Sequence, residues 1–142
     1  MNRVLGSVVF IVLLSMLSTG SYAGGGQEMG PAKYYAEPLQ TVTMMEAQTL
    51  VGKEGVYFFD VNTLELWAEG FIPGAVYFNV KNWKDLLPKN KDALMVFYCA
   101  NRLCNASEIA ARHVMKLGYT NVLQMPDGIY GWRLANRVTE KP

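Results

Sequence analysis

The sequence predicts an α/β domain built on a mainly parallel sheet that helices flank. Two observations carry this prediction. The run Ala93–Tyr98 is continuously apolar rather than alternating, as in a strand that helices cover on both faces. The segment Ala106–Leu117 repeats its apolar residues at helical spacing and ends at Gly118. Short runs of both kinds alternate along the chain, which is typical of parallel strands joined by helices.

The elements before the strongest strand follow from local signals. Thr43 and Glu46 have the spacing of a capping box, which begins a helix that runs to about Gly52. The run Val56–Asp60 has the β-branched and aromatic residues of a buried strand. Three further elements are expected: a helix over 63–69, a strand over 75–78 after a Pro-Gly turn, and a weak helix over 82–87.

The helix after the strongest strand is expected to turn one face to the sheet and a charged face to solvent. A strand over 121–125 and a last helix that runs through Trp132 to about residue 137 complete the domain. The expected sheet-facing residues of the helix over 106–117 are Ala106, Ile109, Ala110, His113, Val114 and Leu117.

Residues 1–23 have the three-part form of a secretory signal peptide. Arg3 precedes the apolar run Val4–Leu17, which as a helix is shorter than the ~30 Å hydrocarbon core. We therefore expect cleavage, no stable membrane insertion afterwards, and a periplasmic or secreted protein in an oxidising compartment; the alternative is an uncleaved anchor. Residues 24–36 are expected to form a flexible leader, and residues 37–142 the folded domain.

The composition excludes several classes of protein. The 142 residues carry a formal net charge of +1, which argues against a nucleic-acid partner because such proteins show a basic excess. Two cysteines cannot form a disulfide scaffold, and with one histidine they make a poor zinc site, so no metal is expected. That histidine, His113, lies on a different element from the cysteines and is expected to be structural.

The segment Cys99–Cys104 is the candidate site, because it joins the strongest strand to the following helix. Sites in parallel sheets form at the carboxyl ends of strands, beside helix N-termini. The partial positive charge there favours a thiolate at Cys99, and successive loop amides can form an anion nest. Arg102 adds a cation for an anionic sulfur or phosphorus substrate. The alternative is that Cys99 is a small buried apolar side chain.

Five short strings lie in order over about residues 41–135: Asp60-Val61, Glu69–Val76, Phe97–Cys99, Gly118–Val122 and Asp127–Trp132. In order and spacing they resemble the rhodanese (sulfurtransferase) domain. The resemblance implies a five-stranded, mainly parallel central sheet flanked by helices. It also implies a catalytic cysteine at the first position of its loop, which here is Cys99, with the loop running to Cys104.

The resemblance implies an enzyme, a sulfurtransferase that works by covalent catalysis. The Cys99 thiolate would take the outer sulfur of a small anionic donor, thiosulfate or polysulfide, and become a persulfide. A thiol, a cyanide-like acceptor or an acceptor protein would then remove that sulfur. The chemistry needs no cofactor. The loop amides would stabilise the anionic persulfide, so the expected substrate-binding residues are Ala100, Asn101, Arg102, Leu103 and Cys104.

The chain departs from the family's pattern at several positions. The family often has His at Phe71, Arg at Asn62 and Gly at Asp127. Losing the Arg removes a structural ion pair, whereas the other two changes are expected to leave the fold unaltered. Arg102 is the only charge in the loop, which leaves polysulfide or a protein persulfide open as the donor beside thiosulfate. Phosphatase relatives have Arg at the position of Asn105, so phosphatase activity is disfavoured.

Two residues have open roles. Cys104 is a candidate redox partner that resolves the Cys99 persulfide or forms a reversible disulfide with it; otherwise it is a small residue at a helix start. Asp60 ends a strand at the same edge of the sheet and is a candidate for site support, or a helix cap. Two alternatives to the sulfurtransferase stay open: a non-catalytic rhodanese-fold binding module, and a dithiol redox protein that uses both cysteines.

Overall fold

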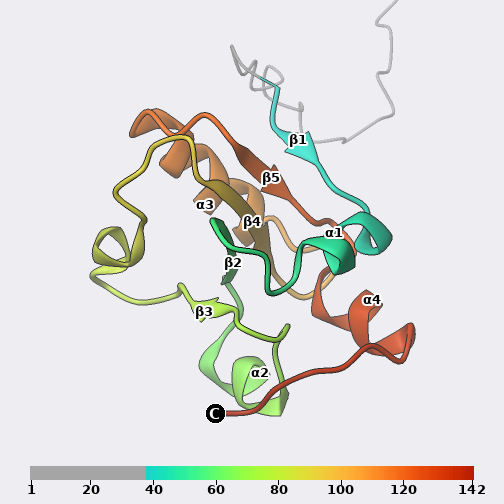
Figure 1. The fold of residues 1–142 in the computed structure, drawn as a ribbon. Helices are drawn as coiled ribbons and strands as arrows, with labels where there is room; N and C mark the ends of the chain where they lie inside the picture. The colour runs from blue at the N-terminus through green and yellow to red at the C-terminus, as the bar shows by residue number, and fades with distance from the viewer. Residues whose placement is uncertain (1–37) are drawn as a thin grey trace, which may run out of the picture. The chain divides into compact units, whose positions relative to one another are not determined.

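The computed structural model describes residues 38–142, so the expected signal segment and leader lie outside the described residues. Within this part, five strands form one sheet in the order β1-β5-β4-β2-β3, and every neighbouring pair is parallel (Figure 1). The predicted α/β class with a five-stranded parallel sheet is confirmed. The strands are β1 (Gln40–Thr41), β2 (Val56–Asp60), β3 (Val76–Tyr77), β4 (Leu94–Tyr98) and β5 (Val122–Gln124).

The helices begin close to the residues that the sequence indicates. Thr43 Oγ1 accepts a hydrogen bond from the Glu46 amide at 3.2 Å, and Glu46 Oε2 accepts one from the Thr43 amide at 3.0 Å, so the capping box is present. Among residues 38–142, no helix is long and apolar enough to span a bilayer. The helices are α1 (Met44–Leu50), α2 (Leu64–Glu69), the 3₁₀ helix η1 (Trp83–Leu86), α3 (Ala106–Lys116) and α4 (Gly128–Leu134).

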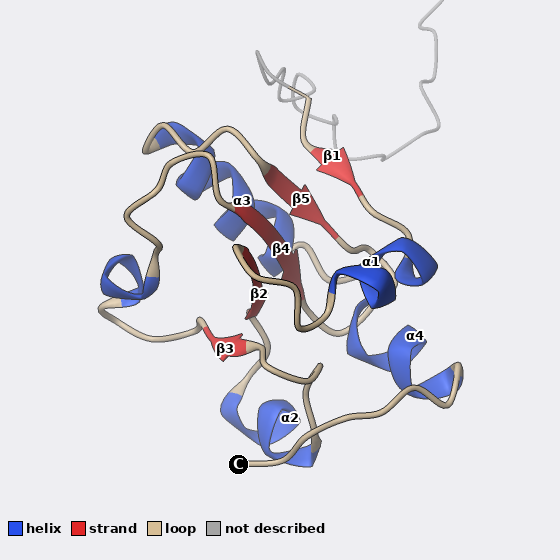
Figure 2. Ribbon diagram, viewed as in Figure 1, coloured by secondary structure: helices blue, strands red, loops and turns tan. Residues whose placement is uncertain are grey.

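Helices cover both faces of the sheet (Figure 2). Side chains of α1, α2 and α4 share one buried cluster with Val96 and Tyr98 of β4. Side chains of α3 and η1 share a second cluster with Met95 and Phe97 of the same strand. Successive residues of a strand point to opposite faces, so a strand covered on both sides is apolar at every position. This double coverage explains the continuous apolar run of β4.

The buried face of α3 agrees with the expected one only in part, because Val114 is buried as expected but other expected residues are not. Its buried residues are Ser107, Ala111 and Val114, whereas Ile109 is 48% and Leu117 is 39% exposed. His113 is exposed as well, although it was expected on the sheet-facing side. Ser107 and Ala111 are small, and small side chains let a helix lie close to a sheet. The prediction relied on the larger apolar residues, so the predicted buried face is turned around the helix axis from the observed one.

A segment after α4 lies within the predicted domain, but no structural element was predicted for it. Residues 138–140, the C-terminal strap, run back to the turn between α2 and β3. Phe71 and Glu140 form an antiparallel bridge, and Glu140 Oε2 accepts a hydrogen bond from the Gly74 amide at 3.0 Å. The indole of Trp132 donates to the Val138 carbonyl at 2.8 Å. The strap thereby ties α4 to the turn before β3.

Candidate active site

At the carboxyl end of β4, the connections of the two neighbouring strands run over opposite faces of the sheet. β4 is flanked by β5 and β2. The crossover from β4 to β5 runs through α3 on one face, whereas the crossover from β2 to β3 runs through α2 on the other. Loops that diverge in this way leave a crevice at the strand ends, where ligands of parallel sheets bind. The loop 99–105 between β4 and α3 lies at this crevice.

Cys99 is the first residue of that loop, and its side chain is bonded to Cys104. Cys99 is 2% exposed, whereas Cys104 is partly exposed. The two sulfurs form a disulfide, with the Cα atoms 6.4 Å apart. This separation lies within the range that disulfides span. The loop therefore curls enough to bring the candidate nucleophile and its candidate redox partner together.

A buried hydroxyl lies beside the Cys99 sulfur. Ser107 in the first turn of α3 is 1% exposed, and its Oγ is 3.3 Å from Cys99 Sγ. Gln124 Nε2 at the end of β5 donates to the same Oγ at 3.1 Å. A hydroxyl carries a single proton, so with its oxygen accepting from Gln124 it can donate that proton to the sulfur. The pair Ser107–Gln124 thus presents a hydrogen-bond donor to Cys99.

Neither Ser107 nor Gln124 was identified from the sequence. A signal was present at Ser107, because it lies four and seven residues before Ala111 and Val114 and so shares their helix face. A polar residue on the buried face of a helix that follows a candidate loop marks a site residue. Gln124 carries no comparable signal, because its contact with Ser107 depends on β5 pairing beside β4.

The loop amides are not all free to bind a substrate. Asn101 accepts hydrogen bonds from the Leu103 amide on its side chain at 2.9 Å and from the Cys104 amide on its carbonyl at 3.0 Å. The carbonyl of Cys104 lies 3.3 Å from Cys99 Sγ. Of the five loop residues expected to bind substrate, Leu103 and Cys104 therefore use their amides to shape the loop. Among the described residues, the amides of Ala100, Asn101 and Arg102 make no such hydrogen bond.

The first residues of α4 hold the other side of the loop. The amides of Ile129 and Tyr130 donate to the carbonyls of Cys99 and Ala100 at 2.9 and 3.0 Å. Gly128 makes this approach possible: its φ is +61°, and a Cβ there would lie 2.5 Å from the carbonyls of Cys99 and Ala100. Only glycine meets both requirements. Sequence analysis did not assign this role to Gly128, although the position lies within the Asp127–Trp132 string.

Arg102 is paired within the chain. Its guanidinium contacts Asp127 Oδ1 through Nη2 at 2.7 Å and through Nε at 2.8 Å. Arg102 is 71% exposed and Asp127 is 26% exposed, so solvent weakens the pair. Asp127, where the family often has Gly, thus partly neutralises the only cation of the loop. The expected attraction of Arg102 for an anionic donor is reduced accordingly.

Asp60 lies at the end of β2, in register with Tyr98, and the structure does not bring its carboxylate to the loop. Asp60 is completely buried, and its Oδ1 accepts from the Asn62 amide at 2.8 Å. Burial raises the pKa of Asp60, and the hydrogen bond from Asn62 opposes that shift. Tyr98 points to the α2 side, where its hydroxyl accepts from the Ile72 amide at 3.2 Å. Asp60 therefore supports the β2 end rather than the sulfur.

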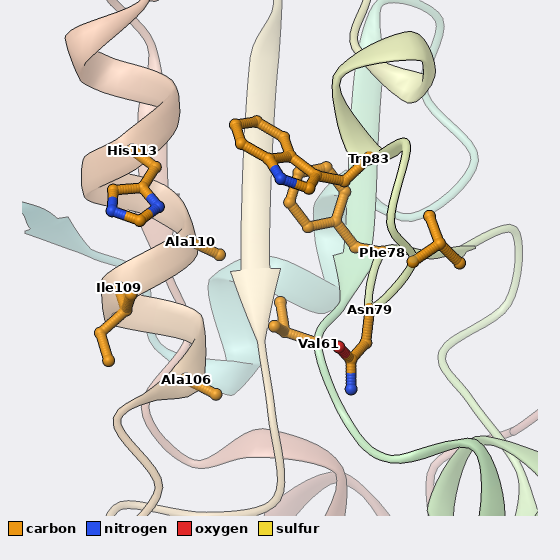
Figure 3. A pocket seen from close by; sticks show the side chains of 9 residues that line it. Val61, Phe78, Asn79, Trp83, Ala106, Ile109, Ala110 and His113 are labelled. Atoms are coloured by element: carbon orange, nitrogen blue, oxygen red, sulfur yellow. The ribbon is translucent and has the colours of Figure 1, made fainter.

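A pocket of about 270 Å³ adjoins the loop on the α3 side (Figure 3). Val61 and Ala106 line it close to the loop, since the Val61 amide donates to the Tyr98 carbonyl at 2.9 Å and Ala106 begins α3. Trp83 and His113 line it farther along α3, with stacked rings whose centroids are 6.5 Å apart. His113 thus lies on the pocket wall. The walls are mainly apolar, which suits an apolar group rather than an anion.

The chain matches a known family over most of its described part. The family model of the rhodanese-like domain matches residues 43–135. A search among curated proteins finds no match. The BH2092 protein from Bacillus halodurans has a similar structure, with 26% identity and a TM-score of 0.63 over 72% of this chain and 77% of that one.

Two sulfurtransferases have similar structures. Thiosulfate sulfurtransferase from Pseudomonas aeruginosa is 23% identical with a TM-score of 0.63, over 73% of this chain and 20% of that one. SseA from Escherichia coli, described among 3-mercaptopyruvate sulfotransferases, is 16% identical with a TM-score of 0.60, over 74% and 51%. This chain spans about one fifth and one half of these enzymes, so the likeness to them shows the fold alone.

Proposed function

The chain belongs to the rhodanese-like domain family, and from this premise we propose that it is an exported sulfurtransferase that moves sulfane sulfur from thiosulfate or polysulfide to a thiophilic acceptor. Structural relatives of the fold include sulfurtransferases. One observation carries the proposal: Cys99 directly follows the central strand, and its sulfur is 3.3 Å from the Ser107 hydroxyl in the first turn of α3. A hydrogen bond that this hydroxyl donates would stabilise the negative charge of a Cys99 thiolate, which is the reactive form.

The proposed reaction begins with reduced Cys99 and has two half-reactions. The Cys99 thiolate attacks the sulfane sulfur of the donor, and sulfite or a shortened polysulfide leaves. The persulfide on Cys99 then gives its outer sulfur to a nucleophilic acceptor, and the thiolate returns. In this proposal the amides of Ala100, Asn101 and Arg102 stabilise the negative charge of the persulfide.

The charge of the loop favours one donor class over the other. Thiosulfate carries two negative charges and needs cationic groups to replace its hydration. Asp127 partly neutralises the loop's cation, since its carboxylate is 2.7 Å from the Arg102 guanidinium. Polysulfide or a persulfide of a small thiol carries less charge per sulfur and depends less on that cation. We therefore propose polysulfide-type donors as the better substrates.

Mass spectrometry of the reduced full chain tests the proposal. The chain is reduced with a dithiol, freed of reductant, and incubated separately with thiosulfate and with polysulfide. At the earliest times after mixing, we expect one added sulfur on Cys99, removable by cyanide as thiocyanate, with polysulfide loading faster. The variant Cys99→Ser should take up no sulfur at this position and keep its folded stability. A reduced and alkylatable Cys99 that accepts sulfur from neither donor would refute the sulfurtransferase.

The disulfide favours one second candidate, a dithiol redox protein. Cys99 and Cys104 are already bonded. A pure redox protein would need both cysteines, would cycle between dithiol and disulfide, and would place no sulfur on Cys99 even at the earliest times. The binding-module alternative predicts that Cys99→Ser leaves partner binding unchanged. The loading experiment separates the three, because only the sulfurtransferase places a cyanide-labile sulfur on Cys99.

A further inference from the structure

Cys104 has no part in the two half-reactions of a sulfurtransferase. Its place in the loop is nevertheless close to the reacting atom, because its sulfur is bonded to that of Cys99. In the reduced chain, the same loop geometry leaves the Cys104 thiol within reach of Cys99 Sγ. When Cys99 carries a persulfide, Cys104 is therefore placed against the inner sulfur of that persulfide.

We propose that Cys104 resolves the Cys99 persulfide, so that the protein reduces sulfane sulfur to sulfide as well as transferring it. The inference rests on the proposed sulfurtransferase half-reaction at Cys99. The Cys104 thiolate attacks Cys99 Sγ, and a bond forms between the two cysteine sulfurs. The bond from Cys99 Sγ to the outer sulfur breaks, and the outer sulfur, which takes up the proton that the Cys104 thiol releases, leaves with the electron pair as hydrosulfide. The product is the Cys99–Cys104 disulfide of this structure.

The disulfide must be reduced to close the cycle, and the proposed reductant is an external dithiol. Cys99 is 2% exposed, whereas Cys104 is partly exposed, so the incoming thiolate reaches Cys104 Sγ. A mixed disulfide forms at Cys104, and Cys99 leaves as a thiolate. The second thiol of the reductant then attacks the mixed disulfide, frees Cys104 and leaves as an oxidised dithiol.

The Ser107–Gln124 pair fixes the direction of this exchange. The Ser107 hydroxyl lies 3.3 Å from Cys99 Sγ, and Gln124 Nε2 occupies its oxygen at 3.1 Å. A donor aimed at Cys99 stabilises the negative charge of that sulfur as it leaves. A leaving group of lower basicity departs faster in thiol–disulfide exchange. Burial and hydrogen bonding therefore give the same assignment: Cys104 is attacked, and Cys99 departs.

The test compares the wild-type chain with Cys104→Ser after a pulse of inorganic polysulfide. Both full chains are reduced, freed of reductant, pulsed, and quenched over time with an alkylating agent that traps thiols and persulfides. Cys104→Ser should retain the added sulfur on Cys99. The wild type should lose it, form the 99–104 disulfide in peptide maps, and release one more equivalent of sulfide per chain than the variant. Cys104→Ala serves as a second variant, and thermal unfolding verifies that both variants are folded.

The outcomes separate this inference from the sulfurtransferase itself. Wild type and Cys104→Ser that hold the persulfide equally long, with equal sulfide release, would overturn the resolving role and leave the sulfurtransferase intact. Uptake of no sulfur by either chain would overturn both. The reductant step has its own readout: a monothiol that blocks the protein as a mixed disulfide should be found on Cys104, and its recovery on Cys99 would overturn the assigned direction.

Discussion

The carboxyl ends of β4 and β2 lie in register, with Asp60 opposite Tyr98, but their polar groups are satisfied very differently. Around Cys99, the buried Ser107 hydroxyl lies within 3.3 Å of both its neighbours, and the carbonyls of Cys99 and Ala100 accept from α4. At the β2 end, Asp60 Oδ2 and Asn62 Nδ2 are buried without a hydrogen-bond partner among the described residues.

The difference shows at which strand end the buried polar groups have hydrogen-bond partners. Buried polar atoms without partners are costly, and the β2 end keeps two of them. The family often has Arg at the position of Asn62, and the shorter Asn leaves its amide unpaired. Arg133 lies near enough to lower the pKa of Asp60, but its guanidinium donates to the Gly70 carbonyl at 2.7 Å. The buried Ser107 hydroxyl at the β4 end has hydrogen-bond partners, whereas the β2 end keeps two buried polar atoms without them.

The largest effect is expected where α4 holds the loop, from Gly128→Ala. The new Cβ would lie 2.5 Å from loop carbonyls at a φ of +61°, so loop and helix must separate. We expect a loss of about 3 kcal/mol in the free energy of unfolding, measured with urea, together with slower sulfur loading. Gly118→Ala is the matched control, because its φ is +91° and a Cβ there meets nothing within 4 Å. Equal losses in both variants would contradict the close approach.

The next effect concerns the hydroxyl beside the sulfur. Ser107→Ala removes a hydrogen bond to a charged group, so alkylation of reduced Cys99 at neutral pH should slow about tenfold and its pH profile should move to higher pH. Ser107→Thr keeps the hydroxyl and should restore the profile. An unshifted profile in a folded Ser107→Ala chain would remove Ser107 from the site.

A smaller effect at the β2 end should depend on pH with a definite sign. Burial raises the pKa of Asp60 above its ordinary value of 3.8, so the native state binds the proton more tightly than the unfolded state. The stability that this tighter proton binding contributes is fully present below pH 3.8, and it is lost as the pH rises through the raised pKa of Asp60. The side chain of the variant Asp60→Asn does not ionise. Its free energy of unfolding should therefore exceed that of the wild type by about 1 kcal/mol at neutral pH, and by less in acid. Urea unfolding at several pH values measures the difference, and a gain that shrinks with rising pH would contradict it.

The smallest effect is expected at the exposed ion pair. Asp127→Asn frees Arg102 and should lower the KM for thiosulfate by up to about threefold at low salt, because exposed pairs contribute little. The KM for polysulfide should change less, and added salt should abolish the gain. Arg102→Gln is the control, since it removes the cation itself. An equal change for both donors would show that Arg102 does not select between them.

The sequence predicted the elements whose signals are local. The apolar run of β4, the aromatic strand β2 and the capping box of α1 are all present. β1 was missed, because Gln40 and Thr41 are exposed and carry no apolar pattern. The segment over 82–87 forms only the 3₁₀ helix η1, and α4 ends at Leu134 rather than at about residue 137.

The sequence predicted only those site residues that lie next to one another along the chain. The Cys99–Cys104 loop follows from a strand that precedes a helix, and both cysteines lie there. Ser107, Gln124 and Gly128 approach this loop from α3, β5 and α4, so their roles depend on how separate elements pack. Spacing along one chain does not reveal such contacts.

The C-terminal strap has a consequence for folding kinetics. Its bond between Gly74 and Glu140 joins residues that are 66 positions apart, and the sheet that it borders has only parallel, non-local pairings. Contacts that close long loops form late, since their loop entropy is lost before they contribute stability. Val138 and Glu140 of the strap are exposed, so the strap should also open more readily than the buried strand β4 in the native state. Amide exchange at Phe71 and Glu140 should therefore be faster than exchange in β4, and the turn before β3 should gain its protection after β4 during refolding.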